Sequence, residues 1–325
     1  DCYDDHTVDL AAGANLISFY ALPEDLSVAN IFDGADAVIG QGVGAVVVNG
    51  GWIGSLTHVS QDDGYWVKVS EATTLNLGDS EPVNYDADGE VNYAIAFGNN
   101  LVSYPFNTPQ DLSTALGNNA ADIYAVAGQG VAALNTVNGW VGSLGAFEGG
   151  YGYWLVATNE DGFDFNFNGV DDGLTRSEQP ELRNVPEIYS YSQSDQQAFF
   201  FVENATISGE SLDNDDIVIA YNGNVIVGSR FWNGELTDIP AIGVDSQGGE
   251  MYVGYCESGD KVSFKVLDAS TGELIDMDVS GDIEWNNMGI SVISLSDKIL
   301  PTEVSLGNAY PNPFNPTTML SYNVP

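Results

Sequence analysis

The chain has 325 residues, enough for two or three domains that each bury a hydrophobic core. Its 47 Asp and Glu outnumber 7 Lys and Arg and give a formal net charge of −40, which excludes nucleic acids and anionic membrane surfaces as partners. Since the chain has no run of 18 apolar residues, we also expect no membrane insertion.

The first half of the chain contains an internal sequence repeat. Three stretches recur in the same order: residues 13–27 (GANLISFYALPEDLS) and 98–113 (GNNLVSYPFNTPQDLS), residues 40–56 (GQGVGAVVVNGGWIGSL) and 128–144 (GQGVAALNTVNGWVGSL), and residues 64–69 (GYWVKV) and 152–157 (GYWLVA). Such a period indicates a tandem duplication. We assign residues 1–82 to a first β repeat and residues 83–160 to a second.

Both repeats have the composition of a β fold. Glycine, asparagine and aspartate separate short runs of valine, isoleucine and aromatic residues, which is typical of strands joined by tight turns. One short helix is predicted in each repeat, with Pro23 and Pro109 in the first helical turn and Thr108 as the N-cap of the second helix.

The duplicated tryptophans admit two interpretations. On an exposed strand face they would stack on sugar rings, whereas in the interior each would fill the small core of its own repeat. Because duplication preserves a fold more reliably than a site, we expect Trp52 and Trp140 in equivalent, largely buried positions. The alternative is sugar stacking by Trp52, Trp66, Trp140 and Trp154.

Residues 161–186 form an Asp-, Asn- and Gly-rich linker that holds a candidate calcium loop. Oxygen ligands at alternate positions before a sharp turn can surround a Ca²⁺ ion. The predicted ligands are Asp164, Asn166, Asn168, the Val170 carbonyl and Asp172. The alternative is a solvated linker without a metal.

This stretch, DFNFNGVDDG, resembles the loops of thrombospondin type 3 calcium repeats and the first nine positions of an EF-hand loop. It departs from both families at Thr175, where a bidentate acid would close the ligand shell, and Glu178 is the next residue able to do so. The resemblance implies calcium as the cofactor.

The remainder of the chain is predicted to be a β-sandwich domain, residues 187–300, followed by a Pro-rich tail, residues 301–325. Alternating or fully apolar runs at regular spacing carry the sandwich prediction. The only cysteines, Cys2 and Cys256, fit no metal motif. They either form a disulfide in an oxidising compartment or remain two unrelated thiols.

The sequence contains no catalytic motif, and we expect no enzyme. His6 and His58 are the only histidines and belong to no triad or metal pattern. Paired carboxylates of a glycosidase need no local motif, so the sequence leaves that class open.

The tail supplies the most specific motif of the chain. NAYPNPFNPTT, followed by an alternating strand that ends at Pro325, resembles the opening of the C-terminal sorting domain of cargo of the bacterial type IX secretion system. The upstream β modules are similar to those of other exported bacterial proteins. These resemblances imply an extracellular or bacterial cell-surface location.

Together these observations predict an all-β protein: two homologous β-rich repeats with one short helix each, a β-sandwich domain and a C-terminal strand. We expect a structural or adhesive surface protein whose partner is itself, in a homo-polymer made by strand donation from the tail, or another surface component. The alternative is a carbohydrate-binding protein, with polysaccharide as partner, or the accessory module of a secreted hydrolase.

Overall fold

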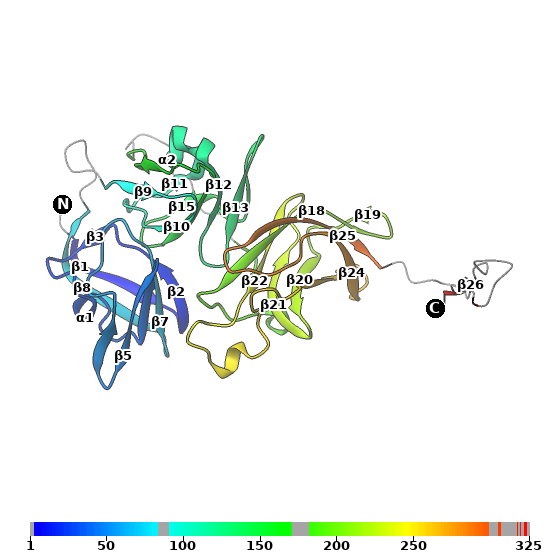
Figure 1. The fold of residues 1–325 in the computed structure, drawn as a ribbon, viewed down its shortest axis with the longest axis horizontal. Coiled ribbons are helices and arrows are strands. Elements are labelled where there is room, and N and C mark those ends of the chain that lie inside the picture. Colours follow the sequence, from blue (N-terminus) through cyan, green and yellow to red (C-terminus); the bar gives the residue numbers. More distant parts are fainter. Residues whose placement is uncertain are drawn as a thin grey trace.

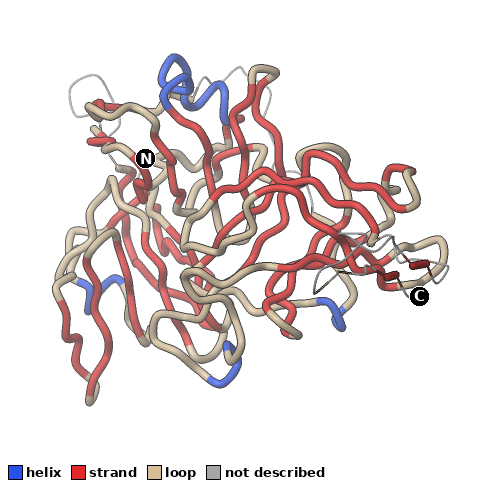
Figure 2. Tube along the Cα trace, turned by 45° about the vertical axis from the view of Figure 1, so that its right-hand side comes forward, coloured by secondary structure: helices blue, strands red, loops and turns tan. Residues whose placement is uncertain are grey.

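The computed structural model describes residues 3–83, 91–170 and 182–298, together with residues 305–306, 317, 319 and 322–323. Strands dominate these residues, and only short helices interrupt them (Figure 1, Figure 2). The all-β prediction is therefore confirmed. None of the helices in these ranges has the length and apolar character needed to cross a membrane.

The first repeat is a five-stranded antiparallel sheet flanked by a three-stranded one. The large sheet has the order β2-β7-β4-β5-β6, and the small sheet the order β1-β8-β3. Their bounds are β1 (Tyr3–Leu10), β2 (Gly13–Ile17), β3 (Ala21–Leu22), β4 (Ala37–Gly40), β5 (Val43–Val48), β6 (Gly51–Gly54), β7 (Tyr65–Val69) and β8 (Thr73–Pro82), with helix α1 (Val28–Ile31) between β3 and β4.

The second repeat has the same topology. Its large sheet runs β10-β16-β12-β13-β14, and β9 pairs with β17 as β1 pairs with β8. The bounds are β9 (Tyr93–Ile95), β10 (Gly98–Val102), β11 (Gln110–Asp111), helix α2 (Leu112–Leu116), the 3-10 helix η1 (Gly117–Asp122), β12 (Ile123–Ala127), β13 (Ala132–Thr136), β14 (Gly139–Gly142), β15 (Ala146–Phe147), β16 (Tyr153–Ala157) and β17 (Phe163–Phe165). The duplication of sequence is thus a duplication of fold.

Each repeat encloses its own core between the large sheet and the short helix. Strand alternation turns Val38 and Val67 inward in the first repeat, and Val126 and Leu155 inward in the second. The helices begin later than the sequence predicts. Asp111, not Thr108, caps α2, and its side chain accepts a hydrogen bond from the Thr114 N–H.

The C-terminal unit, residues 182–298, is built from one strongly bent sheet. The strand order is β19-β18-β25-β24-β23-β20-β21, and β22 also pairs with β18. The bounds are η2 (Glu187–Tyr189), β18 (Gln197–Ile207), β19 (Glu210–Ser211), β20 (Ile217–Asn222), β21 (Val225–Phe231), β22 (Thr237–Ile242), η3 (Glu250–Tyr252), β23 (Ser263–Leu267), β24 (Leu274–Gly281) and β25 (Ile290–Asp297). The bend brings β22 against β21 and encloses a core that includes Phe200, Trp232 and Phe264.

Two short strands of the tail are described. β26 (Ser305–Leu306) pairs antiparallel with β27 (Tyr322–Asn323). Tyr322 and Asn323 of the predicted tail strand therefore pair within the tail.

Candidate functional site

The two repeats face each other across a pseudo-two-fold axis. The Leu16 N–H donates to Gln129 Oε1 at 2.8 Å, and its counterpart, the Leu101 N–H, donates to Gln41 Oε1 at 2.7 Å. Both glutamines lie in the duplicated GQG loops. In each repeat, the glutamine of the GQG loop therefore accepts a hydrogen bond from a backbone N–H of the other repeat's edge strand.

The serines next to these strands repeat the exchange. Ser18 Oγ donates to the Tyr151 carbonyl at 2.6 Å, and Ser103 Oγ donates to the Gln61 carbonyl at 2.7 Å. Such an isologous contact needs the same residues on both sides. It explains why the loop sequences were retained in both copies.

Trp66 and Trp154 fill the same contact between the repeats. They pack with Ala14, Leu16 and Leu101, and Trp66 is only 2 % exposed. Their buried indole nitrogens have no hydrogen-bond partner within the described ranges, so it is their apolar ring surface that serves the contact. These two rings are not available as a platform for a sugar.

Trp52 of β6 and Trp140 of β14 occupy equivalent positions in the two repeats. Each packs against the core of its own repeat, as predicted, but both rings are half-buried rather than largely buried. The reason is their place on β6 and β14, the last strands of the two sheets, where solvent reaches one side of the ring.

The second repeat carries the C-terminal unit on its outer sheet face. Phe199 and Phe201 of β18 pack with Ala125, Ala132 and Leu134 of the repeat, all at most 5 % exposed. Since buried apolar area contributes roughly 25 cal/mol per Å², this contact holds the two units together.

A buried polar cluster closes the edge of that contact. Asp238 of β22 accepts hydrogen bonds from the Ser143 N–H and Ser143 Oγ, both at 2.7 Å, and from the Ala132 N–H at 3.3 Å. Arg230 lies 3.3 Å from the same carboxylate and donates to the Gly130 carbonyl at 2.7 Å. Burial raises the pKa of Asp238, and the Arg230 guanidinium opposes that shift.

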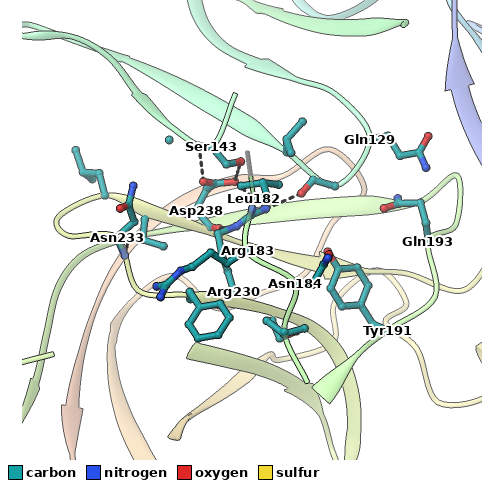
Figure 3. Close-up of a pocket in the computed structure, with 18 of the residues that line it drawn as sticks. Gln129, Ser143, Leu182, Arg183, Asn184, Tyr191, Gln193, Arg230, Asn233 and Asp238 are labelled. Carbon is teal, nitrogen blue, oxygen red and sulfur yellow. Dashed lines mark hydrogen bonds and ion pairs between the residues drawn. The ribbon is translucent and has the colours of Figure 1, made fainter. Parts of the chain in front are cut away.

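A cavity of about 520 Å³ lies beside this cluster, between the second repeat and the C-terminal unit (Figure 3). Amide and guanidinium groups converge on it from both units, and two of the seven cationic side chains line it. Its polar lining includes Gln129, Arg183, Asn184, Gln193, Arg230 and Asn233. The chemistry suits a neutral polar ligand that accepts and donates several hydrogen bonds.

The first repeat touches the C-terminal unit through a buried ion cluster. Lys68 Nζ lies 2.6 Å from Asp245 Oδ1 and 3.4 Å from Asp195 Oδ1. All three side chains are at most 9 % exposed. The residue equivalent to Lys68 in the second repeat is Val156, which packs against the apolar contact instead.

Among the described residues of the candidate calcium loop, only Asp164 lies in a strand. Asp164 lies in β17 opposite Ala94, while Phe165 and Phe167 point into the core of the second repeat. Asn168 Nδ2 donates to the Thr114 carbonyl. Buried phenylalanines therefore alternate with the predicted ligands Asp164, Asn166 and Asn168.

These residues do not form a closed ligand shell as they stand. Asn166 and Val170 follow on the same segment, and Asp172, Thr175 and Glu178 lie outside the described residues. In the parts of the chain that the structure describes, three or more His, Cys, Asp or Glu side chains do not cluster as metal ligands would. Calcium binding stays a prediction.

Cys256 is a free thiol in the core of the C-terminal unit, 1 % exposed. Burial raises the pKa of its thiol to about 12. Cys2 lies outside the described residues. The pairing of Cys2 with Cys256 therefore stays a prediction, and its alternative of two unrelated thiols stays open.

Sequence reasoning missed the residues that join the three units. Gln41 and Gln129 were visible as a repeated GQG, but only the folded pair shows that each reaches across to the other copy. Asp238 and Lys68 carry no local motif. The only available signal was the replacement of Lys68 by Val156 in an otherwise matched stretch.

Comparison with protein-family models, with curated proteins and with solved structures finds no significant match. The function is therefore inferred from the sequence and the geometry of this chain.

Proposed function

We propose that the chain is a secreted or cell-surface structural protein of a bacterium, with an adhesive or scaffolding role, and not an enzyme. The observation that carries this proposal is the use of all six tryptophans inside the molecule. Trp66, Trp232 and Trp285 are buried, and Trp52, Trp140 and Trp154 are half-buried against apolar clusters. Tryptophan rings that pack against apolar clusters stabilise the fold, and this favours a rigid scaffold over a protein that stacks sugars on its tryptophans.

The joints between units support the same proposal. Symmetric hydrogen bonds join the repeats, and the Lys68 ion cluster joins the first repeat to the C-terminal unit. Hydrogen bonds from Ser143 to Asp238 join the second repeat to the same unit. A chain that must bear load between partners benefits from units that do not move independently. The tail motif, with its resemblance to a secretion signal, supports export.

Self-assembly by strand donation from the tail is the proposed mode of polymer formation. Residues 316–325 have the alternating pattern of a strand, and within them β27 (Tyr322–Asn323) pairs with Ser305–Leu306. Such a two-stranded pairing is marginal in water, so a neighbour's sheet edge can compete for it.

Deleting residues 316–325 and measuring mass by light scattering tests this mode. Loss of large assemblies with unchanged circular dichroism supports donation. Assemblies of unchanged mass in the deleted chain contradict it. Fractionation of a producing bacterium, with and without residues 301–325, separately tests the cell-surface location.

The cavity beside Asp238 favours a second candidate function, binding of a neutral carbohydrate. Its amide-rich lining matches hydroxyl groups, and the charge of −40 disfavours acidic polysaccharides. Calorimetric titration with neutral hexose oligosaccharides, for the native chain and for Asn233→Ala, tests it. Absence of heat with the native chain removes this candidate.

Calcium remains a separate proposal for residues 164–172. Binding would have to release Asp164 from its place in β17 and Asn168 from the Thr114 carbonyl. A rise in melting temperature on adding CaCl₂ to chelator-treated protein, lost in Asp164→Ala, supports it. An unchanged melting temperature of the native chain rejects it.

A further inference from the structure

The first repeat carries an uncovered copy of the surface on which the C-terminal unit sits. In the second repeat, paired strands place Val156, Ala125, Leu134 and Val141 in one row across the sheet. The corresponding row of the first repeat is Lys68, Ala37, Val46 and Ile53. The two rows differ in what covers them.

The row of the second repeat is covered by Phe199 and Phe201, which leaves Leu134 only 5 % exposed. In the first repeat Lys68, at one end of the row, contacts the C-terminal unit, and its neighbour Ala37 is buried. The other two members of the row are exposed. Val46 is 38 % exposed and Ile53 is 60 % exposed.

The edge serine shows the same difference. Ser143 accepts from the Ala132 N–H at 3.3 Å and donates to Asp238. Its counterpart Ser55 accepts from the Gly44 N–H at 3.2 Å, but it is exposed. The first repeat therefore keeps the hydrogen bond between β5 and the edge serine, but no described residue of the C-terminal unit is shown bonded to that serine.

The first repeat also extends its apolar surface where the second does not. Val47 and Val48 are 36 % and 44 % exposed, whereas the second repeat has Asn135 and Thr136 at these positions. Asn135 donates to the Ala120 carbonyl, and Thr136 donates to the Gly139 carbonyl of its own hairpin. Residues 37–60 contain no Asp, Glu, Lys or Arg in a chain of net charge −40. Contiguous exposed apolar surface of this kind marks interaction sites.

The backbone of this hairpin is also available for pairing. β6 ends the strand order of its sheet, and its outer edge pairs with no other strand within the described ranges. Figure 1 shows the hairpin of β5 projecting away from the C-terminal unit. An exposed edge strand without charges is a template for a further strand.

We propose that the β5–β6 hairpin of the first repeat is a docking surface for the same hairpin of a second copy. Two chains of charge −40 repel each other over most of their surfaces, so contact is least costly where both sides lack charge. An isologous pairing of β6 with β6 meets this condition, because the same uncharged surface lies on both sides. The proposal deepens the proposed self-assembly and rests on it.

Sedimentation velocity of the full-length chain over a concentration series tests the contact. Because salt screens the repulsion between the two acidic chains, we expect the dimer to tighten from low to high NaCl. Ile53→Asp should raise the dimer dissociation constant by about 30-fold, the size of a hot-spot substitution. Val253→Asp is the matched control, since Val253 is 75 % exposed on the C-terminal unit and the added charge is the same.

Amide hydrogen exchange supplies a second readout. Exchange of residues 51–54 should slow as the concentration of the native chain rises, and it should not slow in Ile53→Asp. A native chain that stays monomeric, or an Ile53→Asp chain that dimerises like the native one, overturns the proposal.

Deletion of residues 316–325 distinguishes failure of the hairpin contact from failure of strand donation by the tail. A chain lacking residues 316–325 should still form the β6-mediated dimer while losing larger assemblies. If that deletion leaves the larger assemblies unchanged while Ile53→Asp still weakens the dimer, strand donation fails and the hairpin contact stands.

Discussion

At the scale of single residues, Asp238 shows how a buried charge is retained in this molecule. The carboxylate is almost fully enclosed, and ionisation there is costly without partners. Ser143 supplies two hydrogen bonds and Arg230 an opposite charge. The cluster therefore depends on groups from two units at once and can form only when the C-terminal unit sits on the second repeat.

We predict that Asp238→Ala lowers the free energy of unfolding by about 3–5 kcal/mol, because it leaves Arg230 buried without its counter-charge. Urea denaturation measures this. Asp215→Ala is the control, since Asp215 pairs with Arg183 at the surface and its side chain is 81 % exposed. That change should cost no more than about 1 kcal/mol. Equal effects of the two substitutions would contradict the assignment.

His6 is predicted to make the molecule sensitive to acid. Burial lowers the pKa of this imidazole below its ordinary value of 6.5. Below pH 6.5 the unfolded chain therefore binds more protons than the native one, and stability is lost as the pH falls through this region. In His6→Gln the drop in melting temperature between pH 7.5 and 5.5 should be smaller. His58→Gln, at an exposed histidine, should retain the native drop.

At the scale of elements, the duplication made the strand content and the equivalence of the repeats predictable. Glycine turns and alternating apolar residues indicated strands that the structure confirms. The helix starts were less predictable. Pro109 suggested a start near Thr108, yet Gln110 is held in β11 and the helix begins only after Asp111. Tertiary pairing with β15 outweighs the local preference.

The role of the repeated GYW and GQG motifs could not be derived from a single copy. A sequence shows that a residue recurs, but it does not show whether the residue faces its own core or the other copy. Tyr65 and Tyr153 face their own cores, while Trp66 and Trp154, one residue later on the same strands, face the contact between the repeats. Strand alternation separates the two roles within one motif.

The glycine of each GYW motif lies close to the other repeat, which gives a prediction about the contact between the repeats. A Cβ at Gly64 would lie 2.8 Å from Leu101 Cδ1 and 3.0 Å from the Val102 carbonyl oxygen, across the pseudo-two-fold axis. We expect Gly64→Ala to lower the free energy of unfolding by about 1–3 kcal/mol through overpacking. Gly51→Ala is the control, because the nearest atom to its Cβ is 3.9 Å away.

Gly152→Ala tests the symmetry of that contact. Its Cβ would lie 2.8 Å from the Ile17 carbonyl oxygen on the opposite side of the axis. The two substitutions should therefore cost similar amounts in chemical denaturation. A cost at one glycine alone would mean that the two halves of the contact are not energetically equivalent.

At the scale of the whole molecule, one C-terminal unit must fit a nearly symmetric pair of repeats. It cannot contact both repeats in the same way. Accordingly, one pair of equivalent positions, Lys68 and Val156, carries different residues in the two repeats. Val156 joins an apolar contact with β18, whereas Lys68 reaches two aspartates of the C-terminal unit. The uncovered hairpin of the first repeat follows from the same asymmetry.

Lys68 is predicted to decide whether the C-terminal unit stays fixed to the first repeat. In Lys68→Met the side chain keeps its length, but Asp195 and Asp245 lose the only cation within 4 Å among the described residues and remain buried. We expect the free energy of unfolding to fall by about 3–5 kcal/mol. Amide exchange should quicken in residues 245–253 while β18, held by the apolar contact with the second repeat, keeps its protection.

Lys265→Met is the control, because Lys265 belongs to an ion pair whose side chains are 33 % and 57 % exposed. This change should lower the free energy of unfolding by about 1 kcal/mol or less. If Lys68→Met matches that control and residues 245–253 exchange as in the native chain, the ion cluster does not hold the two units together.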